Sequence, residues 1–215
     1  MKKCIILANG EPPLKSAINK LKKLGYTDLY CADGGANSAK DMGLVPNYII
    51  GDLDSIDLET VKHFDGKSQV MHYTRQSDTD VEKTLKFIIR KKYNEVILVA
   101  GTGDRLDHSL TNMSIVLRYF SKIKINILHQ KSILTPLAGQ NIIKTTSGEP
   151  ISVFGFNDKT LVTSQGLKYQ MMGTELCFGK FDSQSNEAAS SQIYLNIENG
   201  TVFLVRNFKE WFKNK

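Results

Sequence analysis

The sequence has few cysteines, no long apolar run and no cluster of histidine and cysteine that could bind zinc. Its three cysteines, Cys4, Cys31 and Cys177, are far apart and form no CxxC pair, so neither a disulfide framework nor a structural zinc site is expected. No apolar tract could span a bilayer, and the apolar stretch after Lys2 and Lys3 is too short for a signal-peptide core. We therefore expect a cytoplasmic protein with no membrane partner.

Two common nucleotide-binding signatures are also absent. There is no GxxxxGK[ST] phosphate loop, and in the segment that begins Gly101-Thr102-Gly103 the position of the third glycine of a GxGxxG motif is taken by Leu106. A nucleotide, if one binds, must be held in another way.

The composition is that of a globular chain of one large or two small domains. Its 215 residues are 41% hydrophobic and 23% charged, with a net charge of +6. Most of the positive excess lies before residue 132, which suits a polyanionic ligand. The basic residues lie in groups on expected helix surfaces, without interleaved aromatic residues or a recognisable motif, so a nucleic-acid partner is not expected.

The hydrophobic pattern changes near residue 130. Before it, short β-branched runs alternate with amphipathic stretches, which predicts a three-layer α/β/α domain over residues 1–130 with a mainly parallel sheet. Its strands are expected at 4–8, 28–32, 48–50, 69–73, 95–100 and 124–129, and its helices at 13–24, 58–64, 81–92 and 109–119.

The second part, residues 131–215, reads as an antiparallel β-sandwich domain. Short strands are expected at 151–154, 160–163 and 192–197, with a helix only at the last few positions. Asn199-Gly200 precedes another apolar run at 202–205, and this pair supplies the positive φ angles of a two-residue turn, so a hairpin is expected there.

Four expected strands of the first domain run into acidic loops, at residues 33–35, 51–55, 75–80 and 101–108. The carboxyl ends of parallel strands share one edge, so these loops should converge. Carboxylates brought together repel one another unless a cation neutralises them, which favours a Mg²⁺ site. Asp52 and Asp54 would point to the same side if the chain stays extended; alternatively, Asp54 or Ser55 caps the helix that starts near Asp57.

Other residues in these loops also have two readings. Thr79 and Glu82 fit a capping box, in which each side chain bonds the other residue's backbone. Lys83 could reach an anionic ligand or pair with Asp80. Arg105 offers a cation for phosphate, whereas Asp107 could be a ligand residue or the N-cap of the next helix.

Taken in order and spacing, four segments resemble the thiamine pyrophosphokinase family: Asp33-Gly34-Gly35-Ala36-Asn37, Gly51-Asp52-Leu53-Asp54-Ser55, Ser77-Asp78-Thr79-Asp80 and Arg105-Leu106-Asp107-His108. The second part adds Gly166-Leu167-Lys168-Tyr169, Phe178-Gly179 and Ser185-Asn186-Glu187, which are similar to the segments by which that family holds thiamine. The resemblance runs from the first expected strand to the last.

The resemblance implies transfer of the pyrophosphoryl group of ATP to thiamine by a homodimer whose active sites lie between subunits. By matching positions, it implies Mg²⁺ at Asp52, Asp54 and Asp80, with Lys83 and Arg105 offsetting charge in catalysis. It implies a nucleotide side formed by Asp33, Gly34, Gln76, Thr79, Arg105, Asp107 and His108. For thiamine it implies Tyr169 as an aromatic platform, with Ser185 and Asn186 as hydrogen-bond partners of the aminopyrimidine.

The chain departs from the family pattern at three places. The family commonly has Asp at the position of Ser77 and glycine at that of Asp104, and often Trp at that of Tyr169; Asp78 and Asp104 are extra carboxylates of open role. Two alternatives stay open: a Mg²⁺-dependent kinase or phosphohydrolase of another small substrate, and a non-catalytic sensor of thiamine or nucleotide.

Overall fold

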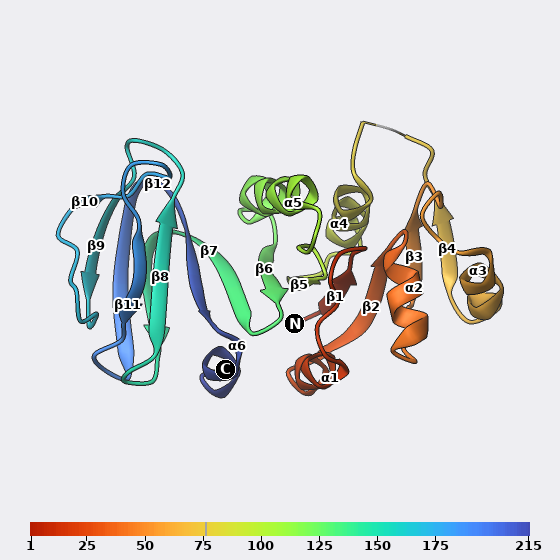
Figure 1. The fold of residues 1–215 in the computed structure, drawn as a ribbon, viewed down its shortest axis with the longest axis horizontal. Helices are drawn as coiled ribbons and strands as arrows, with labels where there is room; N and C mark the ends of the chain where they lie inside the picture. The colour runs from red at the N-terminus through yellow and green to blue at the C-terminus, as the bar shows by residue number, and fades with distance from the viewer. Residues whose placement is uncertain (76) are drawn as a thin grey trace. The chain divides into compact units, whose positions relative to one another are not determined.

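The computed structural model describes residues 1–75 and 77–215 and divides the chain into two units, Met1–Gln130 and Lys131–Lys215 (Figure 1). Gln76, one of the expected nucleotide residues, lies outside the described residues. None of the described helices is both long and apolar enough to span a membrane.

The first unit contains a fully parallel sheet with the strand order β6-β5-β1-β2-β3-β4. Its strands are β1 (Lys3–Leu7), β2 (Tyr26–Ala32), β3 (Tyr48–Gly51), β4 (Gln69–His72), β5 (Glu95–Val99) and β6 (Lys124–His129). The chain adds β2, β3 and β4 on one side of β1 and then β5 and β6 on the other. This reversal opens a crevice at the carboxyl ends of the strands around β1, where ligands of such sheets bind.

Helices cover both faces of this sheet, as right-handed crossovers require (Figure 1). They are α1 (Lys15–Lys23), α2 (Gly35–Asp41), α3 (Leu58–Phe64), α4 (Asp80–Arg90) and α5 (Leu106–Tyr119). The central strands are accordingly buried on both sides: every residue of β5 is buried, and Cys4 and Cys31 are fully inaccessible. Burial raises the pKa of both thiols, which behave as small apolar side chains.

The second unit is antiparallel and is organised around its longest strand. Its elements are β7 (Ser132–Lys144), β8 (Pro150–Gly155), β9 (Leu161–Gln165), β10 (Thr174–Glu175), β11 (Ser183–Glu187), β12 (Gln192–Asn207) and α6 (Phe208–Lys213). β12 pairs with β7 along most of its length, while its first half pairs with β9 and its second half with β8. The expected α/β part with a mainly parallel sheet and the antiparallel β part are thus both confirmed.

The expected hairpin at Asn199-Gly200 is wrong. The chain continues as β12 through a bulge: Ile197 pairs with Gly139 and Val202 with Leu137, so four residues of β12 oppose one of β7. Asn199 does take the positive φ that the pair permits, at 58°, but uses it to bend a strand rather than to reverse the chain. The bulge moves β12 from β9 to β8, and the two halves enclose one core that includes Val153, Val162, Leu195 and Leu204.

A buried ion pair ties β12 to the loop before β8. The Arg206 guanidinium donates to both carboxylate oxygens of Glu149, at 2.7 and 2.8 Å, and also to the Lys144 carbonyl at 2.9 Å. The two charged side chains are 5% and 0% exposed. Each charge is acceptable there only because the other is present.

Arg206→Met is therefore expected to reduce the free energy of unfolding by about 3–5 kcal/mol, because it leaves the Glu149 carboxylate buried without its cation. Urea unfolding followed by fluorescence of Trp211, the only tryptophan and buried in this unit, measures the loss. Lys213→Met is the control, since it removes an ion pair to Glu210 in which the lysine is exposed. A loss from Arg206→Met no larger than that of the control would contradict this account.

Candidate active site

Three loops at the carboxyl edge of the first unit bring three carboxylates together. Asp33 follows β2, Asp52 follows β3 and Asp80 begins α4, and each has a carboxylate oxygen within 4.8 Å of the other two. This convergence is what the order of the parallel strands predicts. Among the described residues, this group does not include Asp54.

Asp33 is the most deeply placed of the three. It is 3% exposed, its Oδ2 accepts from the Ser55 amide at 2.9 Å, and its buried Oδ1 has no hydrogen-bond partner among the described residues. Burial raises the pKa of this carboxyl, and the charges of Asp80 and Asp54 add to the effect against the opposing hydrogen bonds of Ser55. An unpartnered buried oxygen in an acidic group is the donor that a hard cation would take.

The end of β3 must be glycine for the group to form. A Cβ on Gly51 would lie 2.7 Å from Asp33 Cβ and 3.1 Å from Asp80 Oδ1. Both distances are shorter than ordinary van der Waals contact, so any side chain there would separate Asp33 from Asp80.

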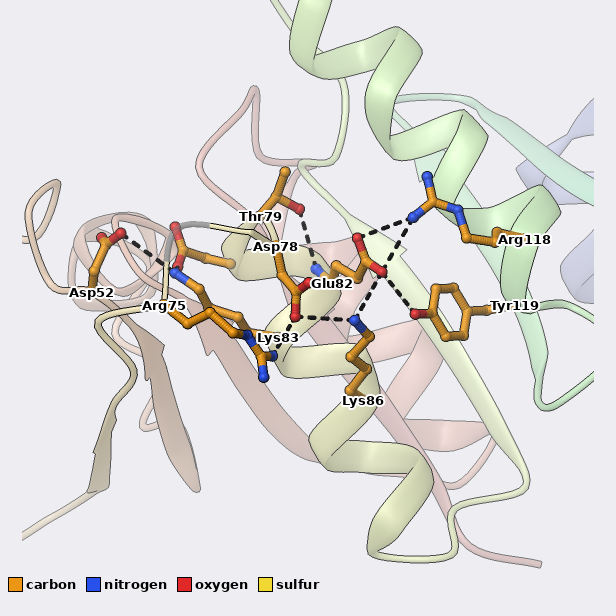
Figure 2. Close-up of polar contacts among 10 residues, drawn as sticks. Asp52, Arg75, Asp78, Thr79, Glu82, Lys83, Lys86, Arg118 and Tyr119 are labelled. Atoms are coloured by element: carbon orange, nitrogen blue, oxygen red, sulfur yellow. Dashed lines mark hydrogen bonds and ion pairs between the residues drawn. The ribbon is translucent and has the colours of Figure 1, made fainter.

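Lys83 is the cation that the protein itself places in this group. It is 3% exposed, and its Nζ donates to Asp80 Oδ1 at 2.9 Å and to Asp52 Oδ2 at 3.4 Å (Figure 2). Burial lowers the pKa of Lys83, but the hydrogen bond and charge of Asp80, together with those of Asp52, outweigh this effect. The pKa of Lys83 is therefore above its ordinary value. Pairing with Asp80 is therefore the arrangement found, and it keeps a positive charge beside the carboxylates.

The chain does not stay extended after Gly51, so the condition under which Asp52 and Asp54 would point to one side is not met. Leu53 has a φ of 66°, which turns the backbone between the two aspartates. Asp54 accepts instead from the Ser55 hydroxyl at 2.9 Å. The alternative that Asp54 or Ser55 caps the next helix is wrong, since the N-cap of α3 is Asp57.

A cavity of about 420 Å³ is lined by two of the three carboxylate residues, Asp33 and Asp80. It is lined by the ends of β1, β2 and β5, by Ser55, by the start of α4 and by the first turns of α5: Ala8, Asn9, Gly10, Ala32, Asp33, Ser55, Thr79, Asp80, Val81, Ala100, Gly101, Thr102, Gly103, Asp104, Arg105, Asp107, His108, Thr111 and Asn112. Of the expected nucleotide residues, Asp33, Thr79, Arg105, Asp107 and His108 face it; Gly34 is the neighbouring N-cap of α2.

Sequence reasoning gave no role to four polar residues of this cavity, Asn9, Thr102, Thr111 and Asn112. Asn9 follows β1, and the strand order alone could have indicated it. Asn112 lies on α5 and donates to the Gly101 carbonyl at 2.6 Å, while Thr102 bonds His129 Nδ1 at 2.7 Å. These last two contacts depend on tertiary packing, so no local pattern pointed to them.

Arg105 and Asp107 form a two-bond ion pair at the cavity. Arg105 donates to the two Asp107 oxygens at 2.9 and 2.6 Å, and this hydrogen bonding lowers the pKa of Asp107. Both side chains are more than half exposed, so the guanidinium is accessible to a ligand. Asp107 is not the N-cap: α5 begins at Leu106 with Arg105 at the cap position.

Half of the expected capping box is present. Thr79 Oγ1 accepts from the Glu82 amide at 3.3 Å, as expected. Glu82 does not reach back to Thr79; its carboxylate accepts from Tyr119 at 2.7 Å, from Arg118 at 3.2 Å and from Lys86 at 3.1 Å (Figure 2). The Glu82 carboxylate binds the Lys86 and Arg118 cations and the buried Tyr119 hydroxyl in place of the backbone at Thr79, and charge-assisted bonds of this kind are the stronger ones, which is the physical reason this part of the expectation fails.

The expected thiamine residues lie in the second unit, where Asn186 holds the backbone of Tyr169. Asn186 Oδ1 accepts from the Tyr169 amide at 3.1 Å, and its Nδ2 donates to the Tyr169 carbonyl at 2.7 Å. Asn186 is 3% exposed, whereas the Tyr169 side chain stands out at 65% exposure. Ser185 is exposed and has a φ of 55°, with its amide bonded to Ser152 Oγ at 3.0 Å.

Two family models match the chain, one in each unit. The model described as thiamin pyrophosphokinase, catalytic domain, matches residues 25–128, and the one described as thiamin pyrophosphokinase, vitamin B1 binding domain, matches residues 140–202. Thiamin pyrophosphokinase 1 of Caenorhabditis elegans is 29% identical, over 94% of this chain and 88% of the relative. Thiamine pyrophosphokinase of Bacillus subtilis is 26% identical, over 85% of this chain and 90% of its own.

Solved structures share the fold along nearly the whole chain. Yeast thiamin pyrophosphokinase superposes with a TM-score of 0.85 at 18% identity, over 99% of this chain and 88% of that one. The Candida albicans enzyme gives 0.84 at 16% identity, over 96% and 89%. With both family models matched and the fold shared, this chain belongs to the thiamin pyrophosphokinase family.

Proposed function

We propose that this chain transfers the pyrophosphoryl group of ATP to the hydroxyl of thiamine, giving thiamine diphosphate and AMP. The observation that carries the proposal is the match to both the catalytic and the vitamin B1 binding models of one family. The acidic group beside a cavity with an accessible arginine suits a polyphosphate with its metal ion.

We propose that Mg²⁺ binds at Asp52, Asp54 and Asp80, with the Asp33 carboxylate beside them. Asp33 Oδ1, which has no hydrogen-bond partner among the described residues, and the convergence of three carboxylates support a cation site. The charge of Asp54 also contributes to the raised pKa of Asp33. When bound, Mg²⁺ would offset the negative charge of the phosphates.

The residues of the chain have complementary tasks in this proposal. Lys83 and Arg105 present positive charge to the phosphates, and one carboxylate of the group accepts the proton of the attacking thiamine hydroxyl. We infer that the nucleotide side is formed by Asp33, Gly34, Gln76, Thr79, Arg105, Asp107 and His108.

The division of labour between the units is part of the proposal. The first, residues 1–130, would bind ATP and Mg²⁺; the second, residues 131–215, would bind thiamine through the Tyr169 ring and Ser185, with Asn186 fixing the backbone of Tyr169. We further propose a cytoplasmic homodimer with its active sites between subunits, as the family resemblance implies.

Incubation with ATP, thiamine and Mg²⁺ is expected to yield thiamine diphosphate and AMP in equal amounts, because the β-phosphorus is the proposed point of attack. Separation of nucleotides by anion-exchange chromatography measures this. Formation of ADP would instead establish a kinase, and thiamine binding without turnover would establish a sensor.

Asp52→Asn and Asp54→Asn are each expected to lower kcat by about 100-fold or more, because each removes a carboxylate charge with almost no change in volume. The same assay measures the loss, and EDTA should abolish the wild-type activity until Mg²⁺ is added back. Asp41→Asn, at an exposed position of α2, serves as the matched control. Near-normal activity of either variant would remove that residue from the metal site.

Tyr169→Ala is expected to raise the KM for thiamine about three- to tenfold and to leave the KM for ATP unchanged, because it removes an aromatic platform for the thiazolium. Tyr169→Trp should keep the KM for thiamine at or below the wild-type value. Initial rates at varied thiamine and at varied ATP separate the two constants. An unchanged thiamine dependence in Tyr169→Ala would exclude the residue from the site.

A further inference from the structure

Asp78, an extra carboxylate next to the metal-site loop, lies in a second ionic network. Its Oδ2 accepts from Lys86 Nζ at 3.0 Å and from the Arg75 guanidinium (Figure 2). The side chain of Asp78 is only 10% exposed, and Asp78 is not in the group formed by Asp33, Asp52 and Asp80 among the described residues. Its charge is thus already engaged by two cations of the chain.

Lys86 links this loop to the helices. Its Nζ also lies 3.1 Å from Glu82 Oε1, so one ammonium joins an acid before α4 to an acid within it. Glu82 is in turn bound by Arg118 and Tyr119 of α5. Charges of alternating sign therefore run from the loop, along α4, to α5.

The geometry of a helix explains why Lys86 reaches Asp78. Side chains tilt towards the N-terminus, and residues four apart share a face, so Asp78, Glu82 and Lys86 form one row. Asp80 and Lys83 lie on another face of the same turn, where they meet Asp52. The start of α4 is held on two faces by two separate sets of charges.

We propose that Asp78 and Lys86 are positioning residues: their ion pair holds residues 77–79 against α4 and thereby places Asp80 in the metal site. Asp78 then acts through Lys86 and is not itself a ligand of the metal. The inference rests on the proposed function only in taking Asp80 as a residue of the metal site.

The sign of one substitution separates this role from a purely electrostatic one. Lys86→Met removes a positive charge near the acidic group, which by charge alone would tighten the binding of a divalent cation. If Lys86 instead positions Asp80, the same substitution must weaken that binding. Asp78→Asn weakens it under both accounts, so Lys86→Met is the decisive variant.

The test measures Mn²⁺ binding to the full-length protein without substrates, by the electron paramagnetic resonance signal of free Mn²⁺. We expect Asp78→Asn and Lys86→Met each to raise the dissociation constant for Mn²⁺ about three- to tenfold. The dissociation constant of the double variant should not exceed the larger of the two single-variant values, because the two residues act through one bond. Lys86→Arg should retain most of the wild-type affinity. Lys62→Met removes an exposed lysine of α3 and is the matched control.

Amide hydrogen exchange supplies a second measurement that does not depend on the metal. Exchange of residues 77–82 should be faster in Asp78→Asn and in Lys86→Met than in the wild type, with exchange in the sheet unchanged. Tighter Mn²⁺ binding by Lys86→Met, additive effects of the two substitutions, or unchanged exchange in both would overturn the inference.

Failure of the inference and failure of the proposed function are distinguishable. If the wild type forms no AMP but the Asp78 and Lys86 variants show the expected changes in Mn²⁺ binding and amide exchange, the proposed function is overturned and the positioning role is supported. Wild-type protein that forms AMP, with Mn²⁺ binding unaffected by Lys86→Met, would overturn the positioning role alone.

Discussion

Repulsion between carboxylates at one edge of a parallel sheet is the constraint on which the rest of the first unit depends. Asp33 and Asp52 come from two loops and Asp80 from the first turn of α4, and like charges within 4.8 Å of each other raise the free energy of the folded chain unless a cation lies among them. Lys83 supplies one positive charge to the group by pairing with Asp52 and Asp80. Asp33 Oδ1 has no hydrogen-bond partner among residues 1–75 and 77–215, so Lys83 does not neutralise it, and a divalent ion can bind several such oxygens at once.

Holding these groups together requires rigidity elsewhere. The sheet fixes the ends of β2 and β3, and Gly51 allows their loops to approach closely. Asp80 is different, because it stands on the first turn of a helix whose preceding loop is anchored by side chains. The network of Asp78, Lys86, Glu82 and α5 supplies that anchor on the face of α4 away from the site. Acidic residues close together in sequence thus have separate tasks.

Much of this arrangement could be predicted from the sequence, and what could not has a common cause. The alternation of strands and helices predicted the parallel sheet, and the strand order placed the acidic loops on one edge. The hairpin at Asn199-Gly200 failed because a positive φ bends a strand as readily as it ends one, and the pairing of β12 with β7 decides between them. The extended backbone expected from Asp52 to Asp54 failed at the positive φ of Leu53. The Glu82 half of the capping box failed because Arg118 and Tyr119, 36 and 37 residues away, bind its carboxylate. Local patterns carry no information about such partners.

The contact between Asn186 and Tyr169 bears on one departure from the family pattern, the Tyr at a position where the family often has Trp. Asn186 bonds the amide and the carbonyl of Tyr169, not its ring. The backbone is therefore held in the same place whichever aromatic side chain it carries, and the exposed ring is left to meet a ligand. If the Tyr169 ring is the thiamine platform, as proposed, a Tyr in place of the family's Trp would change the strength of the cation–π contact without changing where the platform stands. Loss of the buried amide of Asn186 would have the opposite effect, because the ring would keep its chemistry and lose its position.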